Sequence, residues 1–379
     1  MSSSMNFDET TAGIPLTGLT PAPAQQWGAV RIIPLLRAGS PGDLRLRPRK
    51  VDAAAVDVGD GTAYFAFMPH AYVMQWTDDG QPLAAYGAQL HARGSHTPTR
   101  QTPILHRMAK REDRNALRFV PLHLAMEGFL ALHFGGPDVA WHEYSREALA
   151  SGLSPRSERA VPGLWIAGLE DALRVFEIHD DQVGVLVFVA DALASAFVVP
   201  HPDDYLQLHR SLLGDFYGEL LFQYGLLYRE VQSFDLEIDA RTIDTLEQLR
   251  TAVASGRRLW HQHSLLMTEG LLARTTRWQT VYRAGQFRLR RFIGELHPEH
   301  EGHIGEAIVR ADGTLEYLKT YRLSAAQVRR AYLLERLAKH DWHLSRCAES
   351  FGDTVPALLV RLRNAGFGYL LKPHILRGL

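Results

Sequence analysis

Apolar residues near the C-terminus repeat with the spacing of three short amphipathic helices. The three series are Leu333, Leu334 and Leu337; then Leu344, Cys347, Ala348 and Phe351; then Leu358, Leu359 and Leu362. Gly352 supplies a residue for a turn with positive φ, and Asp353 or Thr354 provides an N-cap before Pro356. Gly366 ends the last series. The pattern predicts a helix-turn-helix between Ala331 and Phe367.

The rest of the chain alternates between strand and helix patterns. Val183–Val189 is the strongest strand, continuous enough to be buried on both faces, and a second strand, Ala194–Val199, and a long amphipathic helix, Tyr205–Tyr228, follow it. We expect further strands at 30–36, 63–68, 71–76, 83–86, 119–124, 286–295, 304–309 and 315–321, and helices at 141–149, 168–177, 243–254 and 264–274. Asp312-Gly313 predicts a tight hairpin turn between the last two strands.

These elements predict an α+β protein in four parts. Residues 1–26 are rich in Ser, Thr, Pro and Gly without periodicity, so we expect a disordered arm. Residues 27–228 then form an N-terminal mixed β-sheet domain with covering helices. Residues 229–323 form a basic connecting region with a β-hairpin, and residues 324–379 form an all-α unit that Ser324 begins as an N-cap.

The net charge of −1 hides an asymmetry along the chain. Residues 251–379 contain 20 Lys and Arg against 11 Asp and Glu, while residues 1–250 contain 21 against 31. A basic C-terminal part is typical of nucleic-acid binding, although the two parts could equally attract each other. The lone Cys347 excludes an internal disulfide framework, and no apolar run is long enough to cross a membrane. We therefore expect a soluble cytoplasmic protein.

A run of arginines interleaved with aromatic residues gives a second candidate for nucleic-acid contact. It includes Arg288, Arg290 and Arg291 beside Phe287 and Phe292. Arginine and aromatic side chains can follow a phosphate backbone and stack on bases. The same run could instead be the outer face of a sheet that closes on an acidic domain, and the sequence does not choose between the two.

Candidate chemistry outside these regions is sparse. His297, His300 and His303 lie in one loop and could bind a divalent metal, although such tracts are more often solvated loops. Asp203 either lines a pocket or, with Asp204, caps a helix. The chain has no P-loop and no G-x-G-x-x-G after a strand, and it lacks G-x-S-x-G and H-E-x-x-H. We therefore expect no cofactor beyond that metal and lean against an enzyme.

The run from Phe351 to Gly366 resembles the C-terminal helix-turn-helix of Fis-type DNA-binding proteins. The matching positions are Phe351, Gly352, Thr354, Leu358, Arg361, Leu362 and Gly366. The family usually has a basic or polar residue early in its recognition helix, where this chain has Val355 and Pro356. The resemblance therefore implies contact with duplex DNA through phosphates, with Arg346, Arg361, Arg363 and Lys372 as donors. It also makes Thr354 a candidate for nucleic-acid contact. It also implies a homodimer, while packing or dimerisation alone stays open.

A second resemblance covers about half of the chain. Val30–Leu35, Phe119–Phe129, Val139–Glu143 and Gln182–Gly225 are similar to the type-one ARPP family, named for its association with ADP-ribosylglycohydrolase and rhodanese-phosphatase proteins. The resemblance implies a fold and a place near NAD or ADP-ribose metabolism, without a reaction. Trp141 and Glu143, at the family's recurrent helix start, could line a cleft for a nucleotide or ADP-ribose-type ligand, or could be packing residues.

Three hypotheses follow from the sequence. The first is a cytoplasmic DNA-binding regulator that joins an ARPP-like sensor or interaction domain to a helix-turn-helix. The second is a ligand-binding protein or enzyme of NAD or ADP-ribose metabolism whose C-terminal helices only dimerise. The third is an interaction scaffold.

Overall fold

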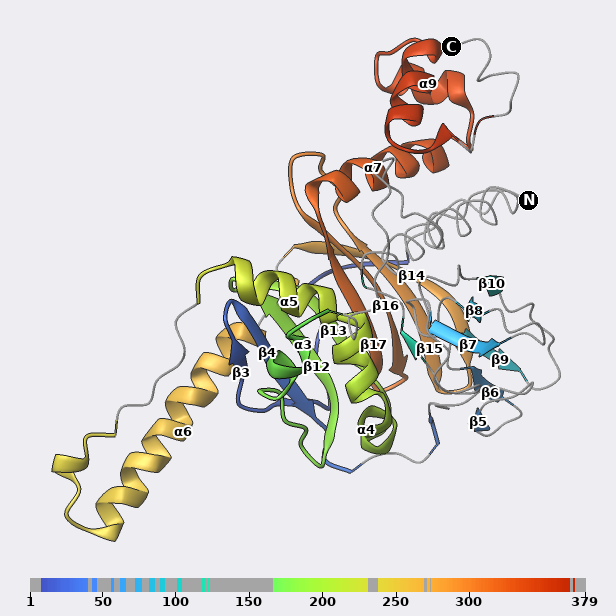
Figure 1. Cartoon of the computed structure of the whole chain (residues 1–379). Helices are drawn as coiled ribbons and strands as arrows, with labels where there is room; N and C mark the ends of the chain where they lie inside the picture. The colour runs from blue at the N-terminus through green and yellow to red at the C-terminus, as the bar shows by residue number, and fades with distance from the viewer. Residues whose placement is uncertain are drawn as a thin grey trace.

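One large antiparallel sheet organises the protein (Figure 1). The computed structural model describes residues 8–39, 43–45, 166–230, 238–268 and 274–368, together with shorter segments at 56–57, 62–65, 72–76, 82–85, 89–92, 101–103, 118–119, 122, 271–272 and 371. The sheet has ten strands in the order β1-β14-β15-β16-β17-β13-β12-β4-β2, and β3 also pairs with β4. Its strands are β1 (Glu9–Ala12), β2 (Thr20–Pro21), β3 (Gln25–Trp27), β4 (Val30–Leu36), β12 (Gln182–Val189), β13 (Ala192–Val198), β14 (Thr275–Ala284), β15 (Phe287–Gly294), β16 (Gly302–Arg310) and β17 (Leu315–Leu323).

Tight turns make neighbouring strands run in opposite directions. Ala190 and Asp191, with φ of 46° and 63°, join β12 to β13, as a turn with two left-handed residues does. Gly285, with φ of 54°, begins the turn between β14 and β15, and the predicted Asp312-Gly313 turn joins β16 to β17. The prediction of a mixed sheet is therefore wrong for this sheet, since parallel pairing needs a long crossover connection that these hairpins lack.

Helices cover one face of the sheet. They are α3 (Leu169–Leu173), α4 (Pro202–Ser211), the π-helical turn η2 (Leu212–Phe216) and α5 (Gly218–Leu227). Their apolar residues join one core cluster with Val185, Phe197 and Tyr317 of the sheet. The sequence predicts one helix over 205–228, but the π turn divides that segment into three parts. A π turn inside a helical segment often marks a functional position.

The N-terminal segment crosses the other face of the sheet. β1 pairs with β14 at one edge, and β2 and β3 pair with β4 at the opposite edge. Ile14 is buried between them, in a second core cluster with Trp278 and Phe292. The prediction of a disordered arm therefore fails for residues 8–26. Backbone pairing at both edges and a few apolar side chains are enough to order a segment whose sequence has no periodicity.

Seven short strands form two smaller sheets. One has the order β10-β8-β7-β11 and the other β5-β6-β9. Their strands are β5 (Val56–Asp57), β6 (Thr62–Phe65), β7 (Tyr72–Trp76), β8 (Pro82–Ala85), β9 (Gln89–Ala92), β10 (Gln101–Pro103) and β11 (Arg118–Phe119). β7 pairs with β8 in antiparallel fashion, in agreement with the predicted hairpin, whose turn residues lie outside the described part of the chain.

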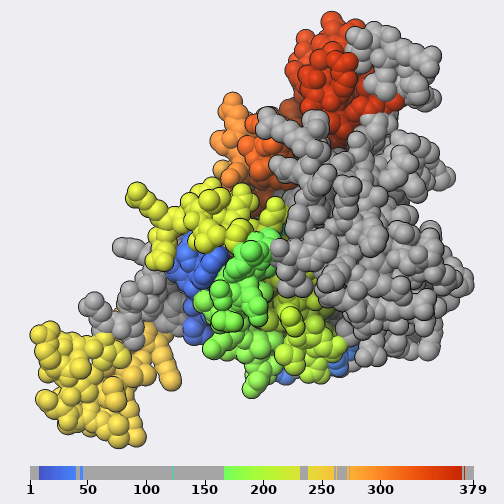
Figure 2. Space-filling view, in the orientation of Figure 1, coloured from blue at the N-terminus to red at the C-terminus, as the bar shows by residue number. Residues whose placement is uncertain are grey.

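The remaining helices lie at the two ends of the molecule. The short turn η3 (Ala240–Thr242) precedes α6 (Leu246–Thr268), which projects from the body (Figures 1 and 2). The three C-terminal helices are α7 (Ala325–Lys339), α8 (Leu344–Ser350) and α9 (Val355–Asn364). Within the described residues, no helix is both long and apolar enough to span a membrane.

The sheet crosses the domain boundary expected at residues 228–229. β4, β12 and β13 come from the predicted N-terminal domain, and β14–β17 come from the predicted connecting region, yet β13 pairs directly with β17. The connecting hairpins therefore complete the N-terminal sheet. β17 leads at Leu323 into Ser324, whose side chain accepts from the backbone N–H of Gln327 and confirms the predicted N-cap of α7.

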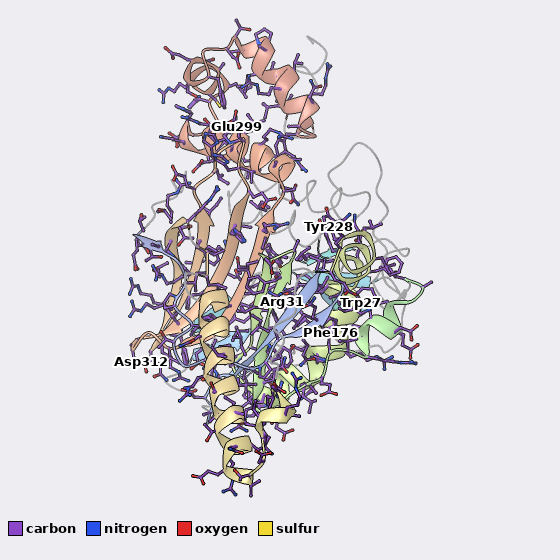
Figure 3. All side chains as sticks on the ribbon, turned by 90° about the vertical axis from the view of Figure 1, so that its left-hand side faces the viewer. Trp27, Arg31, Phe176, Tyr228, Glu299 and Asp312 are labelled. Atoms are coloured by element: carbon purple, nitrogen blue, oxygen red, sulfur yellow. The ribbon has the colours of Figure 1, made fainter. Side chains whose placement is uncertain are left out.

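Close packing between Trp27 and α5 fixes β3 against the helical layer. Figure 3 shows Trp27 beside the helix that ends before Tyr228. A Cβ atom placed on Gly225 would lie 1.8 Å from the Trp27 ring. Glycine at position 225 therefore leaves the space that the indole fills.

We predict that Gly225→Ala destabilises the protein by about 1–3 kcal/mol, because overpacking forces the ring or the helix to move. Urea unfolding followed by circular dichroism measures this. Adding Trp27→Leu should recover part of the loss, while Gly368→Ala, whose new Cβ would meet only Arg363 Cγ at 3.9 Å, should change stability by less than about 0.5 kcal/mol. Equal losses in Gly225→Ala and Gly368→Ala would contradict the packing argument.

Candidate functional site

A tight glycine turn connects α8 to α9, and α7 packs against α8. Gly352 has φ of 67°, and the Asp353 N–H donates to the Ala348 carbonyl at 2.9 Å. The Thr354 side chain accepts from the Ala357 N–H at 3.4 Å and so caps α9. Cys347, Ala348, Leu358 and Leu362 are buried, and Gly366, with φ of 82°, ends α9. The predicted helical segments, turn and cap are confirmed.

The predicted phosphate donors of this unit differ in how they are held. Arg346 and Arg363 are exposed, and neither forms an ion pair within the described residues. Arg361 is paired with Asp353 at 2.9 Å and stacks on the Phe351 ring at 5.0 Å. Lys372 lies outside the described residues. Two cations are therefore presented to solvent, and a third is held against the turn.

The exposed start of α9 is apolar. Pro356, Ala357 and Val360 are exposed, while Thr354 uses its hydroxyl for the helix cap. Base reading by a recognition helix depends on side-chain donors and acceptors near its N-terminus. This surface presents the guanidinium groups of Arg346 and Arg363 beside an apolar helix start.

The arginines of β15 are used within the protein. Arg290 pairs with Glu9 at 2.6 Å and stacks on Trp278 at 4.8 Å, and Arg291 approaches the buried Glu306 at 3.6 Å. No ion pair of Arg288 is seen among the described residues. Because Glu9 comes from the N-terminal segment, these contacts favour the alternative in which the basic face closes on acidic groups. Their use in nucleic-acid contact loses support.

A row of charged side chains crosses the helix-covered face of the sheet. Arg291 on β15 lies opposite Glu306 on β16, and Glu306 lies opposite Lys319 on β17. Glu306 and Lys319 are completely buried. Neither residue is among the candidates predicted from the sequence, although each interrupts an apolar series at a core-facing position of a strand. That interruption is the signal from which they could be found.

Aromatic rings from the sheet and the π turn surround the Lys319 amine. Its Nζ lies 3.3 Å from the centre of Phe216, 4.6 Å from Phe197 and 5.3 Å from Tyr321. Burial lowers the pKa of Lys319 well below its ordinary value, while the nearby Glu306 acts in the opposite direction. The π turn η2 brings Phe216 into this cluster and buries Asp215 close to it in the chain.

A second charged network joins the sheet to the segment after β4. Glu316 is fully buried, pairs with Arg37 at 2.9 Å and also contacts Arg310. Arg310 also donates a hydrogen bond to the Asp43 carboxylate, and this hydrogen bond lowers the pKa of Asp43. Each charge has an opposite partner, as buried charges require. We assign this network a structural role.

The three histidines proposed as a metal site do not converge. His297 and His300 stack with ring centres 4.6 Å apart, but His303 Nε2 lies 3.0 Å from the Leu193 carbonyl oxygen. Among the described residues, no group of three or more His, Cys, Asp or Glu side chains could hold a metal ion. The strand β16 begins at Gly302, so the His303 ring is fixed by the sheet while the other two stay in the loop.

Asp203 lies on the surface. Its side chain is 65% exposed, and the predicted N-cap is wrong, because His201 Nδ1 accepts from the Asp203 N–H and so caps α4. Asp204 is the buried neighbour and accepts hydrogen bonds from Arg45, whereas the exposed Asp203 contacts Arg45 at 3.6 Å and His201 at 3.4 Å. Trp141 and Glu143 lie outside the described residues.

Comparison with protein families decides the identity of the sheet region. The model of the ARPP-2 family matches residues 14–285, which is more than half of the chain. The chain belongs to the ARPP-2 family. The match corrects the type-one resemblance, and it gives no support to a Fis-type assignment of the C-terminal helices, which lie beyond it. Neither the curated proteins nor the solved structures include a match to this chain.

The ARPP-2 match ends inside the sheet. Residues 14–285 contain the segment after β1, the strands up to β14 and the helices up to α6. The strands β15–β17 complete the same sheet and include Glu306 and Lys319. The buried charge row therefore lies on the part of the sheet that follows the matched region.

We predict a loss of stability below neutral pH that depends on His303. Burial lowers the pKa of its imidazole to about 4, whereas an unfolded histidine titrates near 6.5. As the pH falls, His303 therefore takes up a proton in the unfolded chain before it does so in the folded protein. The free energy of unfolding is unaffected by protonation of His303 above about pH 6.5 and decreases by roughly 1–3 kcal/mol between there and about pH 4. Urea unfolding at pH 7 and at pH 4.5 measures this.

His303→Gln provides the control for this pH dependence. Its amide can donate to the Leu193 carbonyl without titrating, so the difference in unfolding free energy between the two pH values should shrink relative to the unaltered protein. An unchanged difference would show that His303 is not the responsible group.

Proposed function

We propose that this ARPP-2 protein is a DNA-binding regulatory protein whose C-terminal helices contact the phosphates of duplex DNA. The observation that supports the proposal is the α8–turn–α9 arrangement with Arg346 and Arg363 exposed on it. In such motifs one helix lies in the major groove while neighbouring side chains hold the backbone. The sheet region would act as the sensor or interaction part.

Phosphate contact predicts affinity with little sequence preference. The exposed apolar start of α9 lacks the donors that read bases, so the binding energy would come mainly from counterion release. Each phosphate contact contributes about 0.9 to the slope of log affinity against log salt. Affinity should therefore be similar for unrelated duplexes and should fall steeply as salt rises.

We predict that Arg346→Ala with Arg363→Ala lowers affinity for a labelled duplex at about 50 mM salt by roughly tenfold or more, and lowers the salt slope by about 2. Fluorescence anisotropy of the full chain over a salt series measures both quantities. Arg174→Ala, an exposed arginine at the C-cap of α3 that pairs with Asp171, serves as the control and should leave both unchanged. Absence of duplex binding by the unaltered protein at low salt would end the proposal.

A second candidate is binding of a nucleotide or ADP-ribose-type ligand by the sheet region, in which the C-terminal helices only dimerise. The buried Lys319 cluster and the π turn beside it favour this candidate, because shifted pKa values and π turns are both enriched at functional sites. The two candidates differ in the role of the C-terminal helices, which contact DNA in the first and only dimerise in the second.

For this candidate we predict that ADP-ribose, NAD or ADP raises the melting temperature of the full chain. A ligand that binds only the folded state at 100 times its Kd adds about 2.7 kcal/mol. Differential scanning fluorimetry at about millimolar ligand measures the shift. A melting temperature that none of these nucleotides changes would count against ligand binding by the sheet region.

A further inference from the structure

A cavity of about 610 Å³ lies between α7 and α9 at the base of the C-terminal helices. Figure 3 places Glu299, the neighbour of Pro298 in the lining, at this end of the molecule, while Asp312 lies at the opposite end of the sheet. The volume falls within the range of small-molecule sites, which often form where two structural units meet.

The cavity combines an apolar floor with a cationic rim. Leu333, Ala365, Tyr332 and Phe351 provide apolar and aromatic surface. The cations are Arg329, Arg330 and Arg361. Among the described residues, no carboxylate lines the cavity, so three positive charges face it without an acidic group in its wall.

Contacts with neighbouring side chains hold two of these guanidinium groups in place. Arg361 stacks on Phe351 at 5.0 Å and bonds Asp353, and Arg330 stacks on Phe367 at 5.3 Å. Stacking on a ring fixes the plane of an arginine while its N–H groups can still donate to an acceptor. The rim is therefore preorganised for an anion.

A neighbouring cavity of similar size differs from this one in the charges that line it. It has a volume of about 660 Å³ and also contacts Tyr332, but three carboxylates, Glu295, Glu335 and Asp341, line it together with three cations, Arg277, Arg336 and Lys339. The carboxylates are part of the wall of that cavity, whereas Asp353, the partner of Arg361, is not among the described residues that line the first cavity. Opposite charges balance in that lining, whereas the charges in the described lining of the first cavity are all positive, so an anion is attracted more strongly to the first cavity.

We propose that the cavity between α7 and α9 binds a small anionic molecule with an apolar body, namely a carboxylate or sulfonate attached to an aromatic ring or an aliphatic chain. The acid group accepts hydrogen bonds from Arg329 and Arg361, which can bind such groups in a fork geometry. The apolar body packs on Leu333, Tyr332 and Phe351. This inference stands apart from DNA binding, since it depends only on the lining of the cavity.

The test uses the full chain and the fluorescent probe 8-anilinonaphthalene-1-sulfonate, which has an apolar ring system and one negative charge. We expect saturable fluorescence enhancement, with displacement by decanoate and not by the uncharged decanol. Ala326→Trp fills the cavity from an exposed position of α7 and should weaken probe binding at least tenfold. Arg329→Gln should weaken it several-fold.

Two matched variants on the same helix serve as controls. Ala338→Trp and Lys339→Gln alter the neighbouring cavity and should leave probe affinity within about twofold. Thermal melting followed by circular dichroism verifies that each variant folds. If Ala326→Trp does not fold, the affinity of Arg329→Gln, which changes a surface residue, tests the proposal. The proposal is overturned if all four variants bind the probe alike, or if decanol displaces it as well as decanoate.

Discussion

The pairing of β17 on both of its edges is the constraint on which the rest of the structure depends. β17 lies between β13, which comes from the ARPP-2 region, and β16, its own hairpin partner. Its last residue, Leu323, leads directly into the capped start of α7. Arg277 of β14 also pairs with Glu335 of α7, so the helices are attached to the sheet twice. The C-terminal unit is therefore positioned by the sheet.

The same strand brings charged groups into the interior. Glu316 and Lys319 are both completely buried, and each lies near a group of opposite charge. Such groups are costly to bury, and removing one partner of a buried pair is strongly destabilising. The aromatic rings around Lys319 come from the sheet and from the π turn, so this position connects the helical layer to β17.

The sequence predicts well those elements whose apolar period is strong. The strand at Val183–Val189, the hairpin around Asp312-Gly313 and the three C-terminal helices all occur near their expected positions. The ordering of residues 8–26 could not be predicted, because it depends on edges of a sheet formed by distant segments. The division of the predicted helix at 205–228 could not be predicted either, because a π turn of five residues does not clearly change the spacing of apolar residues.

The candidate site shows the same division between local and distant determinants. The Gly352 turn and the Thr354 cap follow from local sequence and are seen. The partners of Arg290 and Arg291 are Glu9 and Glu306, and only the register of the folded sheet brings them together. The Lys319 cluster likewise joins residues from β13, η2 and β17. Distant pairing, rather than composition, determines which charges remain exposed.

Hydrogen exchange of the full chain with and without a duplex, at low salt, tests most directly whether the C-terminal helices are the DNA-contacting part. The account predicts that added protection is confined to peptides from α8 and α9, with α6 and the β14–β15 hairpin unchanged. Protection concentrated in α6 or in β14–β15 would contradict it, because DNA would then bind a surface other than that of α8 and α9.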